Sequence, residues 1–395
     1  MRGKRAGPWC AALIAAAAIG LWWFAAVRFA WQGNATALFM IGEHTPVPEW
    51  LERSEPLYRW RGSGGYDGQY FHLLAHAPFA FRQLAPLMDR PRMRCQRILA
   101  PLAAWLLAGG RQEWIDKAWL AAMLGWLALG VWSTAMLAAR RGASAWWGLA
   151  FLALPASLGS VERMLVDGPL MAAMAALLWL LETGRWKAAW LAAAAAPFLR
   201  ESGLLFPAAA ALVFLARQRI RMAAWAASAG IPFLLWLASI RDLPGGVEFF
   251  WSGWFASVAK LLSDGETYAV YARWSPWLHA LDLAAFCGFL FACAASLILA
   301  VRLLRQRDAQ PFTETAAALF AMAALALAHV EPRHAWDSVF SMGRVFAPAY
   351  FGLLMRGLET GRTVPGLLCL APAALRAALG FGPVAQRIVQ GLAGA

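Results

Sequence analysis

Long apolar stretches alternate with short polar turns along almost the whole chain. An α-helix needs roughly 20 apolar residues, and sometimes as few as about 17, to cross the core of a bilayer. Stretches that approach this length lie at residues 9–31, 115–139, 144–160, 165–182, 186–199, 202–216, 222–240, 276–301, 313–330, 338–356 and 364–380. The pattern predicts an all-α polytopic integral membrane protein with about eleven transmembrane helices, in which residues 1–395 form a single membrane domain.

The first apolar stretch follows a basic N-terminus, Met1–Arg5. A cleaved signal peptide has a similar start, but its apolar region is only about 7–15 residues long. Because the stretch 9–31 is longer, we expect it to be a signal-anchor span. Residues 32–114 then form a structured external loop, the remaining spans occupy 115–380, and 381–395 form a tail. Within the loop, the apolar stretch 98–108 is too short to span and is expected to form a helix at the membrane surface.

Composition supports this reading. The chain is 61% hydrophobic and only 14% charged, whereas soluble domains are roughly 45–50% apolar and about 25% charged. Although the net charge is +13, no basic run suggests a nucleic-acid partner. The five cysteines show neither a Cys-x-x-Cys pattern nor metal-ligand spacing, so no disulfide or cysteine metal site is implied.

The distribution of Lys and Arg indicates the orientation in the membrane. If the N-terminus is cytoplasmic, the short inner segments carry most of the basic residues near span ends, as the positive-inside rule requires. These residues are Arg2, Lys4, Arg5, Arg140, Arg141, Arg185, Lys187, Arg217, Arg219, Arg221, Arg302, Arg305, Arg307, Arg356 and Arg362. Most of the acidic residues then fall on the outer side, either because the two long loops lie there or because that face is functional.

The segment from Ser63 to Tyr70, in the first external loop, places a carboxylate on a glycine-rich turn. Asp67 is flanked by glycines, which permit tight turns and close approach of a substrate. We expect Asp67 to be the catalytic residue, acting as a general base toward a hydroxyl group, and Tyr66 and Gln69 to bind substrate. The alternative is that Asp67 is an ordinary turn residue.

Three short outer turns combine an arginine with an acid. They contain Arg163 with Asp167, Arg200 with Glu201, and Glu331 with Arg333, and Arg344 lies about two helical turns deeper. Ionisable groups at membrane depth are costly and often functional, so Arg163, Asp167, Arg200, Glu201 and Arg344 are expected to bind substrate. Each pair could instead anchor a helix at the interface.

Two further features of the loop bear on ligands. The basic run Arg90, Arg92, Arg94 and Arg97 suits a phosphate head group, and Arg97 is best placed because it lies at a helix start, although anchoring to anionic lipid is an equal alternative. His72 and His76 share a helical face, so a divalent metal with Asp67 is conceivable. A histidine pair without a third ligand is weak evidence, and no cofactor is firmly expected.

Several of these segments together resemble a known family. They are Gly65–Phe71, Arg97–Pro101, Leu199–Gly203 and Gly343–Pro348, in that order. They resemble a bacterial family of polytopic proteins linked to cell-surface glycopolymer formation, similar to GT-C membrane glycosyltransferases. The resemblance implies a GT-C-like fold in the bacterial inner (plasma) membrane, a polyprenyl-phosphate-linked sugar as donor, a glycan or lipid acceptor, and Asp67 as the catalytic acidic residue.

The expected function is therefore transfer of a sugar to a hydroxyl acceptor at the outer face of the inner membrane, with membrane lipid as the surroundings. The alternatives are a transporter or flippase of lipid-linked glycans and a non-catalytic subunit of glycan assembly. A transporter should have polar residues at mid-span, whereas the polar groups here gather at the outer ends of the spans.

Overall fold

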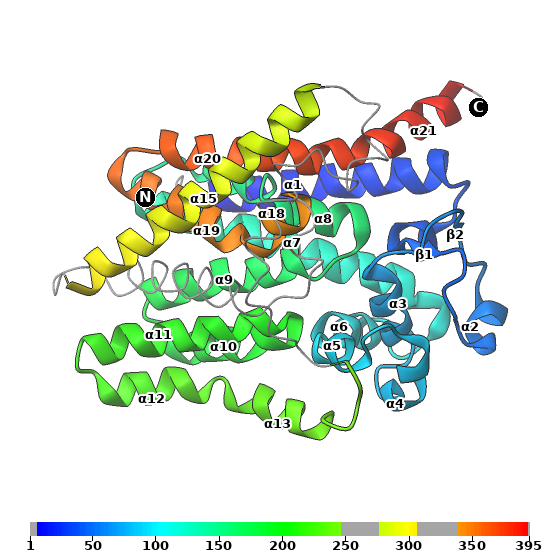
Figure 1. Ribbon diagram of the computed structural model, residues 1–395, viewed down its shortest axis with the longest axis horizontal. Coiled ribbons are helices and arrows are strands. Elements are labelled where there is room, and N and C mark those ends of the chain that lie inside the picture. The colour runs from blue at the N-terminus through cyan, green and yellow to red at the C-terminus, as the bar shows by residue number, and fades with distance from the viewer. Residues whose placement is uncertain (1–5, 246–275, 306–338, 394–395) are drawn as a thin grey trace.

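The computed structural model describes residues 6–245, 276–305 and 339–393. The expected span 313–330 and the turn with Glu331, Arg333, His334 and Asp337 lie outside these residues. In Figure 1 the long helices run lengthwise, and the short elements of the first loop gather at the end of the molecule opposite the N-terminus. This end is called the loop end below.

The described part of the chain is almost entirely helical, which confirms the all-α prediction. The helices of the bundle are α1 (Ala6–Ala25, continued by a π-helical turn to Ala30), α7 (Ile115–Arg140), α8 (Pro155–Arg163), α9 (Asp167–Glu182), α10 (Trp186–Leu199), α11 (Leu205–Ala216), α12 (Ile220–Ser228), α13 (Ile231–Ser239), α15 (Pro276–Arg305), α18 (Val339–Val345), α19 (Ala347–Thr360), α20 (Val364–Ala378) and α21 (Gly382–Ala393).

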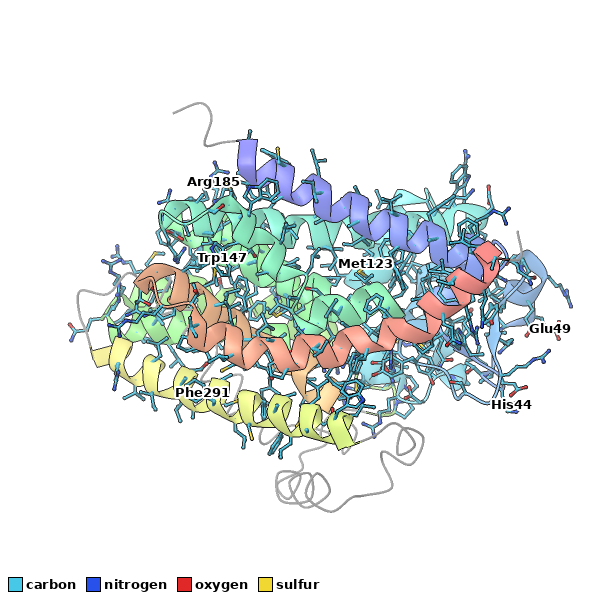
Figure 2. The ribbon with its side chains drawn as sticks, turned by 90° about the horizontal axis from the view of Figure 1, so that it is seen from above. His44, Glu49, Met123, Trp147, Arg185 and Phe291 are labelled. Atoms are coloured by element: carbon cyan, nitrogen blue, oxygen red, sulfur yellow. The ribbon has the colours of Figure 1, made fainter. Side chains whose placement is uncertain are left out.

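Helices that could cross a membrane are present. Within the described residues, five helical segments are long and apolar enough, by length and composition: Ala6–Ala30, Gln112–Arg140, Ile220–Ser239, Ala280–Leu299 and Val364–Ala393. Large apolar side chains such as Leu21, Leu235 and Leu368 point outward from these segments, and Phe291 projects from α15 in Figure 2. Exposed apolar side chains in such numbers suit a lipid surrounding. The total of about eleven spans stays a prediction.

Two expected boundaries differ from the structure. The stretch 144–160 is not one helix, because it forms a 3-10 turn (Ala145–Phe151) and then α8, which begins at Pro155. Proline has no backbone N–H to donate within a helix. It therefore fits the first turn of a new helix, where that group would be unpaired, better than the interior of a continuous helix. The expected tail is helical as α21, which packs against the π-helical turn after α1.

The core surrounds α9, whose residues are buried along nearly its whole length between α7 and α10. Small residues such as Ala172 and Ala175 allow the neighbouring helices to approach closely. At the far end, Arg141 pairs with Glu182 at 3.0 Å, at the last turns of α7 and α9. Figure 2 shows Arg185 at the end opposite His44 and Glu49. Both helices therefore begin at the loop end, where α9 presents Asp167.

The first loop is folded onto the loop end of the bundle. It contains β1 (Ile41–Gly42), α2 (Glu49–Ser54), β2 (Arg59–Trp60), α3 (Gly68–His76), α4 (Phe81–Leu84), α5 (Pro91–Gln96) and α6 (Leu99–Leu107). The two strands pair in parallel, with Ile41 opposite Arg59. Helix α6 corresponds to the expected surface helix, and its last residues Leu106 and Leu107 are exposed.

Candidate functional site

Asp67 lies directly before α3, on a turn whose shape depends on two glycines. Gly65 adopts a φ of +80°, which other residues rarely adopt. A Cβ atom on Gly68 would lie 2.5 Å from the backbone oxygen of Arg163. The Tyr66 backbone N–H donates a hydrogen bond to the Met40 backbone oxygen at 3.0 Å. This bond connects the turn to the residue directly before β1. The Asp67 carboxylate thus sits at a helix start, where the free N–H groups favour negative charge.

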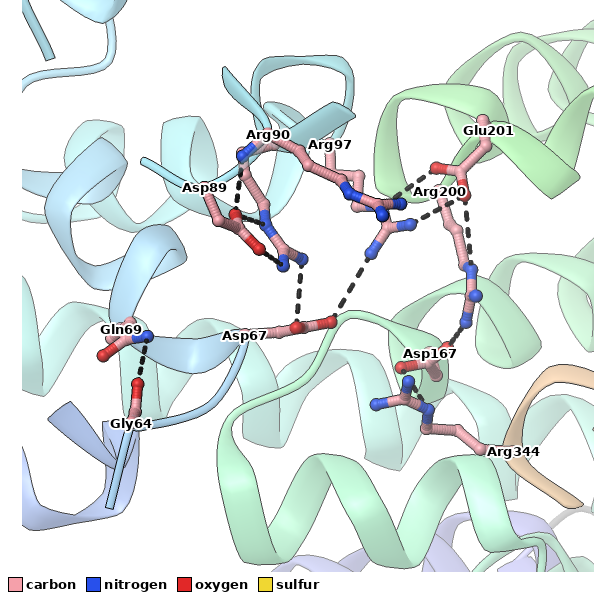
Figure 3. A network of polar contacts seen from close by, with 11 residues as sticks. Gly64, Asp67, Gln69, Asp89, Arg90, Arg97, Asp167, Arg200, Glu201 and Arg344 are labelled. Carbon is pink, nitrogen blue, oxygen red and sulfur yellow. Dashed lines mark hydrogen bonds and ion pairs between the residues drawn. The ribbon is translucent and has the colours of Figure 1, made fainter. Parts of the chain in front are cut away.

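Two arginines contact the Asp67 carboxylate. Arg94 Nη1 lies 3.0 Å from Asp67 Oδ1, and Arg97 Nη1 lies 3.7 Å from Oδ2. The two arginine side chains are 6% and 5% exposed, while that of Asp67 is 23% exposed. Because Arg94 and Arg97 are three residues apart across the end of α5, both can face the same carboxylate. Asp67 is therefore a partly exposed carboxylate that joins two buried arginines (Figure 3).

The ion pairs continue into the helical bundle. Arg97 donates two hydrogen bonds to Glu201, at 2.9 and 2.7 Å. Glu201 Oε1 lies 3.7 Å from Arg200 Nε. Arg200 in turn pairs with Asp167, and Asp167 Oδ2 lies 3.6 Å from Arg344 Nε.

Acids and arginines therefore alternate from the first loop to α18. The chain of contacts, called the charged network below, runs Asp89, Arg94, Asp67, Arg97, Glu201, Arg200, Asp167 and Arg344. It connects the loop, the start of α9, the turn between α10 and α11, and α18. Figure 3 shows it as one continuous group.

The network determines the charge state of Asp67. Burial alone would raise the pKa of Asp67, but the positive charges of Arg94, Arg344, Arg97 and Arg200 outweigh it and lower the pKa from 3.8 to about 2. Asp67 is thus a stable anion at neutral pH. In this arrangement it is a weak base, because its charge is already neutralised by its partners.

Tyr66 lies between two of the expected binding residues. The Arg163 guanidinium lies 4.6 Å from the centre of the Tyr66 ring, and that of Arg344 lies 5.6 Å from it. Arg163 also faces Phe340 at 4.7 Å and contacts Glu162 at 3.3 Å. Arg163 and Tyr66 are therefore joined to the network through cation–π contacts, and not through an ion pair with Asp167.

Gln69 has a different place from the one expected. Its Oε1 accepts hydrogen bonds from the Gly42 N–H at 3.0 Å and the Thr45 hydroxyl at 2.7 Å, and its Nε2 donates to the Gly64 oxygen at 3.3 Å. The side chain is buried and points away from the network (Figure 3). Gln69 therefore holds the loop together, and its expected role in substrate binding stays a prediction.

Arg94 has a larger role in the site than the sequence indicates. From the basic run alone, Arg97 is the residue expected to bind an anion, because it lies at a helix start. The structure makes Arg94 the nearer partner of Asp67, and its second carboxylate, Asp89, lies 2.9 Å from Nη2. Helical spacing was the available signal, because Arg94 shares a face with Arg97.

His72 and His76 come together with two carboxylates, but not with Asp67. Glu55 follows α2 and Asp116 lies in the first turn of α7; the donor atoms of all four residues lie within 4.8 Å of one another. Burial alone would lower the pKa of His72, but Asp116 and Glu55 outweigh it and raise the pKa to about 9. The structure therefore places the two histidines beside Glu55 and Asp116 and not beside Asp67, which pairs with Arg94 instead.

Comparisons of the chain with protein-family models, with curated proteins and with solved structures found no match. The function is therefore argued from the geometry of the site.

Proposed function

We propose that the chain is a membrane glycosyltransferase of the GT-C kind. It transfers a sugar from a polyprenyl-phosphate donor to a hydroxyl acceptor at the outer face of the bacterial inner membrane, in the assembly of a cell-surface glycan. The observation that carries the proposal is the charged network, because it gathers Asp67 and four arginines from distant segments at one end of a helical bundle. The sequence resemblance described above supports the class of donor.

The arginines suit the phosphate of the donor. Arg97, Arg200 and Arg344 are nearly buried and already paired with carboxylates. A phosphate group accepts charge-assisted hydrogen bonds from guanidinium groups, as a carboxylate does. In the transfer, the acceptor oxygen bonds to the anomeric carbon, the bond from that carbon to the phosphate oxygen breaks, and polyprenyl phosphate leaves. Fixed positive charge stabilises the negative charge that develops on the leaving phosphate.

Asp67 suits the acceptor hydroxyl. With its pKa held at about 2, the carboxylate of the resting protein orients a hydroxyl better than it removes the proton. Binding of the donor phosphate draws Arg94 and Arg97 toward the new anion, so the pKa of Asp67 rises toward its ordinary value. The carboxylate then takes the acceptor proton as the new glycosidic bond forms. Donor binding thus prepares the base.

The test is release of polyprenyl phosphate from a lipid-linked sugar, in membranes that contain equal amounts of each variant. Asp67→Asn keeps the size of the side chain and removes the base, so turnover is expected to fall by roughly 10²–10⁴-fold. The matched control is Glu49→Gln, which changes a highly exposed acid of the same loop and should transfer normally. If Asp67→Asn transfers at the wild-type rate, the enzyme proposal fails and the flippase alternative is favoured.

A further inference from the structure

Apart from the charged network, the loop end contains a second cluster of titratable groups, formed by Glu55, His72, His76 and Asp116. His72 and His76 are almost fully buried, and the side chains of Glu55 and Asp116 are each 17% exposed. The four residues come from the end of α2, from α3 and from the start of α7. The proposed sugar transfer makes no use of them.

The distances within the cluster converge on one point. His72 Nε2 lies 2.9 Å from Asp116 Oδ1, 3.1 Å from Glu55 Oε1 and 3.2 Å from His76 Nε2. His76 Nε2 lies 3.3 Å from the same Glu55 oxygen. Four ligands placed about 2.0–2.1 Å from a tetrahedral zinc ion are separated from one another by roughly 3.3 Å. Four of the six donor-atom pairs are therefore spaced as they would be around one small cation, and all four atoms lie within 4.8 Å of one another.

Hydrogen bonding alone does not satisfy these atoms. An imidazole nitrogen carries either one hydrogen or one lone pair, so His72 Nε2 can serve only one of its three close neighbours well. Glu55 Oε1 is buried, and its close neighbours are His72 Nε2 at 3.1 Å and His76 Nε2 at 3.3 Å. A buried carboxylate oxygen is costly unless it is well paired, and each of these two nitrogens also faces another atom of the cluster. A cation at the centre, in place of the proton that the raised pKa of His72 keeps on that ring, would contact all four atoms together.

The orientation of His76 agrees with metal ligation. Gln112 Nε2 donates to the His76 backbone oxygen at 3.0 Å, which directs Gln112 Oε1 toward His76 Nδ1, 2.6 Å away. An amide oxygen can only accept, so His76 Nδ1 carries the hydrogen. In the neutral ring, Nε2 then presents its lone pair to the cluster. Histidines that bind metals are usually oriented by such a hydrogen bond from their other nitrogen.

We infer that Glu55, His72, His76 and Asp116 bind a zinc ion. Two imidazoles with two carboxylates are a donor set that zinc accepts. Four protein ligands also complete a tetrahedral coordination sphere, which is typical of a structural site and not of a catalytic one. The ion would connect the first loop to the start of α7. Helix α7 belongs to the bundle on which the loop with Asp67 is folded.

The first experiment measures metal content. The full-length protein is purified in detergent without a polyhistidine tag, equilibrated in metal-free buffer, and analysed for zinc by mass spectrometry. The wild type is expected to retain about one zinc ion per chain, and Glu55→Gln and His72→Gln should lose it. The matched control is His44→Gln, because His44 is an exposed histidine of the same loop, and it should retain zinc.

The second experiment uses Co²⁺ on protein from which zinc has been removed with a chelator. Wild type and His44→Gln should develop the visible absorption of tetrahedral cobalt, and Glu55→Gln should not. Glu55→Gln is nearly isosteric and partly exposed, so it remains informative if His72→Gln fails to fold. Gln112→Leu keeps all four ligands and should weaken zinc binding by roughly 10–100-fold. A wild type that binds neither metal, or a Glu55→Gln variant with wild-type zinc content, overturns the inference.

Discussion

Replacing Asp67 with asparagine should change the stability of the protein in a way that depends on pH. The pKa of Asp67 falls from 3.8 to about 2 in the folded protein. Each pKa unit corresponds to about 1.4 kcal/mol, so the folded state favours the charged form by roughly 2 kcal/mol. Asp67→Asn removes this stabilisation. The loss should not be larger, because Arg94 keeps Asp89 and Arg97 keeps Glu201 as partners.

The pH window follows from the direction of the change. Because the pKa of Asp67 is lower in the folded protein than in the unfolded chain, its contribution is fully present above about pH 4. It is lost as the pH falls through about 2, where the carboxylate is protonated in both states. The difference between wild type and Asp67→Asn should therefore be roughly 2 kcal/mol at neutral pH and should shrink steadily in acid.

The assay is denaturant unfolding of both proteins in the same detergent, repeated between neutral pH and pH 3. Glu49→Gln is again the matched control, and its stability should change by less than about 0.5 kcal/mol, since exposed charges contribute little. Equal stability of wild type and Asp67→Asn at neutral pH would refute the electrostatic argument. A difference that does not decrease in acid would refute it equally, because its cause would then be steric.

Three further outcomes are expected from the same geometry. Gly68→Ala should destabilise the loop by roughly 1–3 kcal/mol, measured by thermal unfolding, because the added methyl group meets the Arg163 backbone oxygen; unchanged stability would mean that the turn is not tightly seated. Arg344→Ala should raise KM for the donor as well as lower kcat, since it removes a proposed phosphate ligand; an unchanged KM would place the phosphate elsewhere. A cysteine at Gly64 should react with an impermeant thiol reagent from outside, and one at Gln218 should not; the reverse result contradicts the proposed topology.

Part of the candidate site could be predicted from the sequence, at positions where a single physical rule singles out a residue. Asp67 stood out because glycines surround it, and the arginines of the outer turns stood out because charge at membrane depth is costly. The sequence does not show which arginine of the basic run pairs with Asp67, because these arginines differ mainly in the side of the helix on which they lie. Arg94 and Arg97 face Asp67 because of the way α5 packs, and the sequence alone does not show that packing. The direction of the Gln69 side chain could not be predicted for a similar reason, since the residue follows Asp67 closely but turns toward the loop interior.

The cluster of Glu55, His72, His76 and Asp116 shows the limit of spacing arguments more clearly. The spacing of His72 and His76 correctly indicates a shared helical face. It contains no information on carboxylates that are distant in sequence, and Glu55 and Asp116 reach the histidines only because the fold brings the end of α2 and the start of α7 close to α3. Sequence reasoning therefore paired the histidines with the nearest acid, Asp67, whose side chain is instead directed toward Arg94.

Helix α3 connects the two clusters. Asp67 stands at its start and joins the charged network, while His72 and His76 lie farther along it and contact Glu55 and Asp116. At 1.5 Å per residue, His72 lies only about 7–8 Å along the helix axis from Asp67. A short helix held at both ends cannot tilt without breaking ion pairs at one of them, so contacts at α7 also set the direction of the Asp67 carboxylate. The proposed catalytic role of Asp67 requires such support, since small displacements of a positioned group reduce its effect strongly. The contacts of His72 and His76 thus help to fix the position of α3, and through it the position of Asp67.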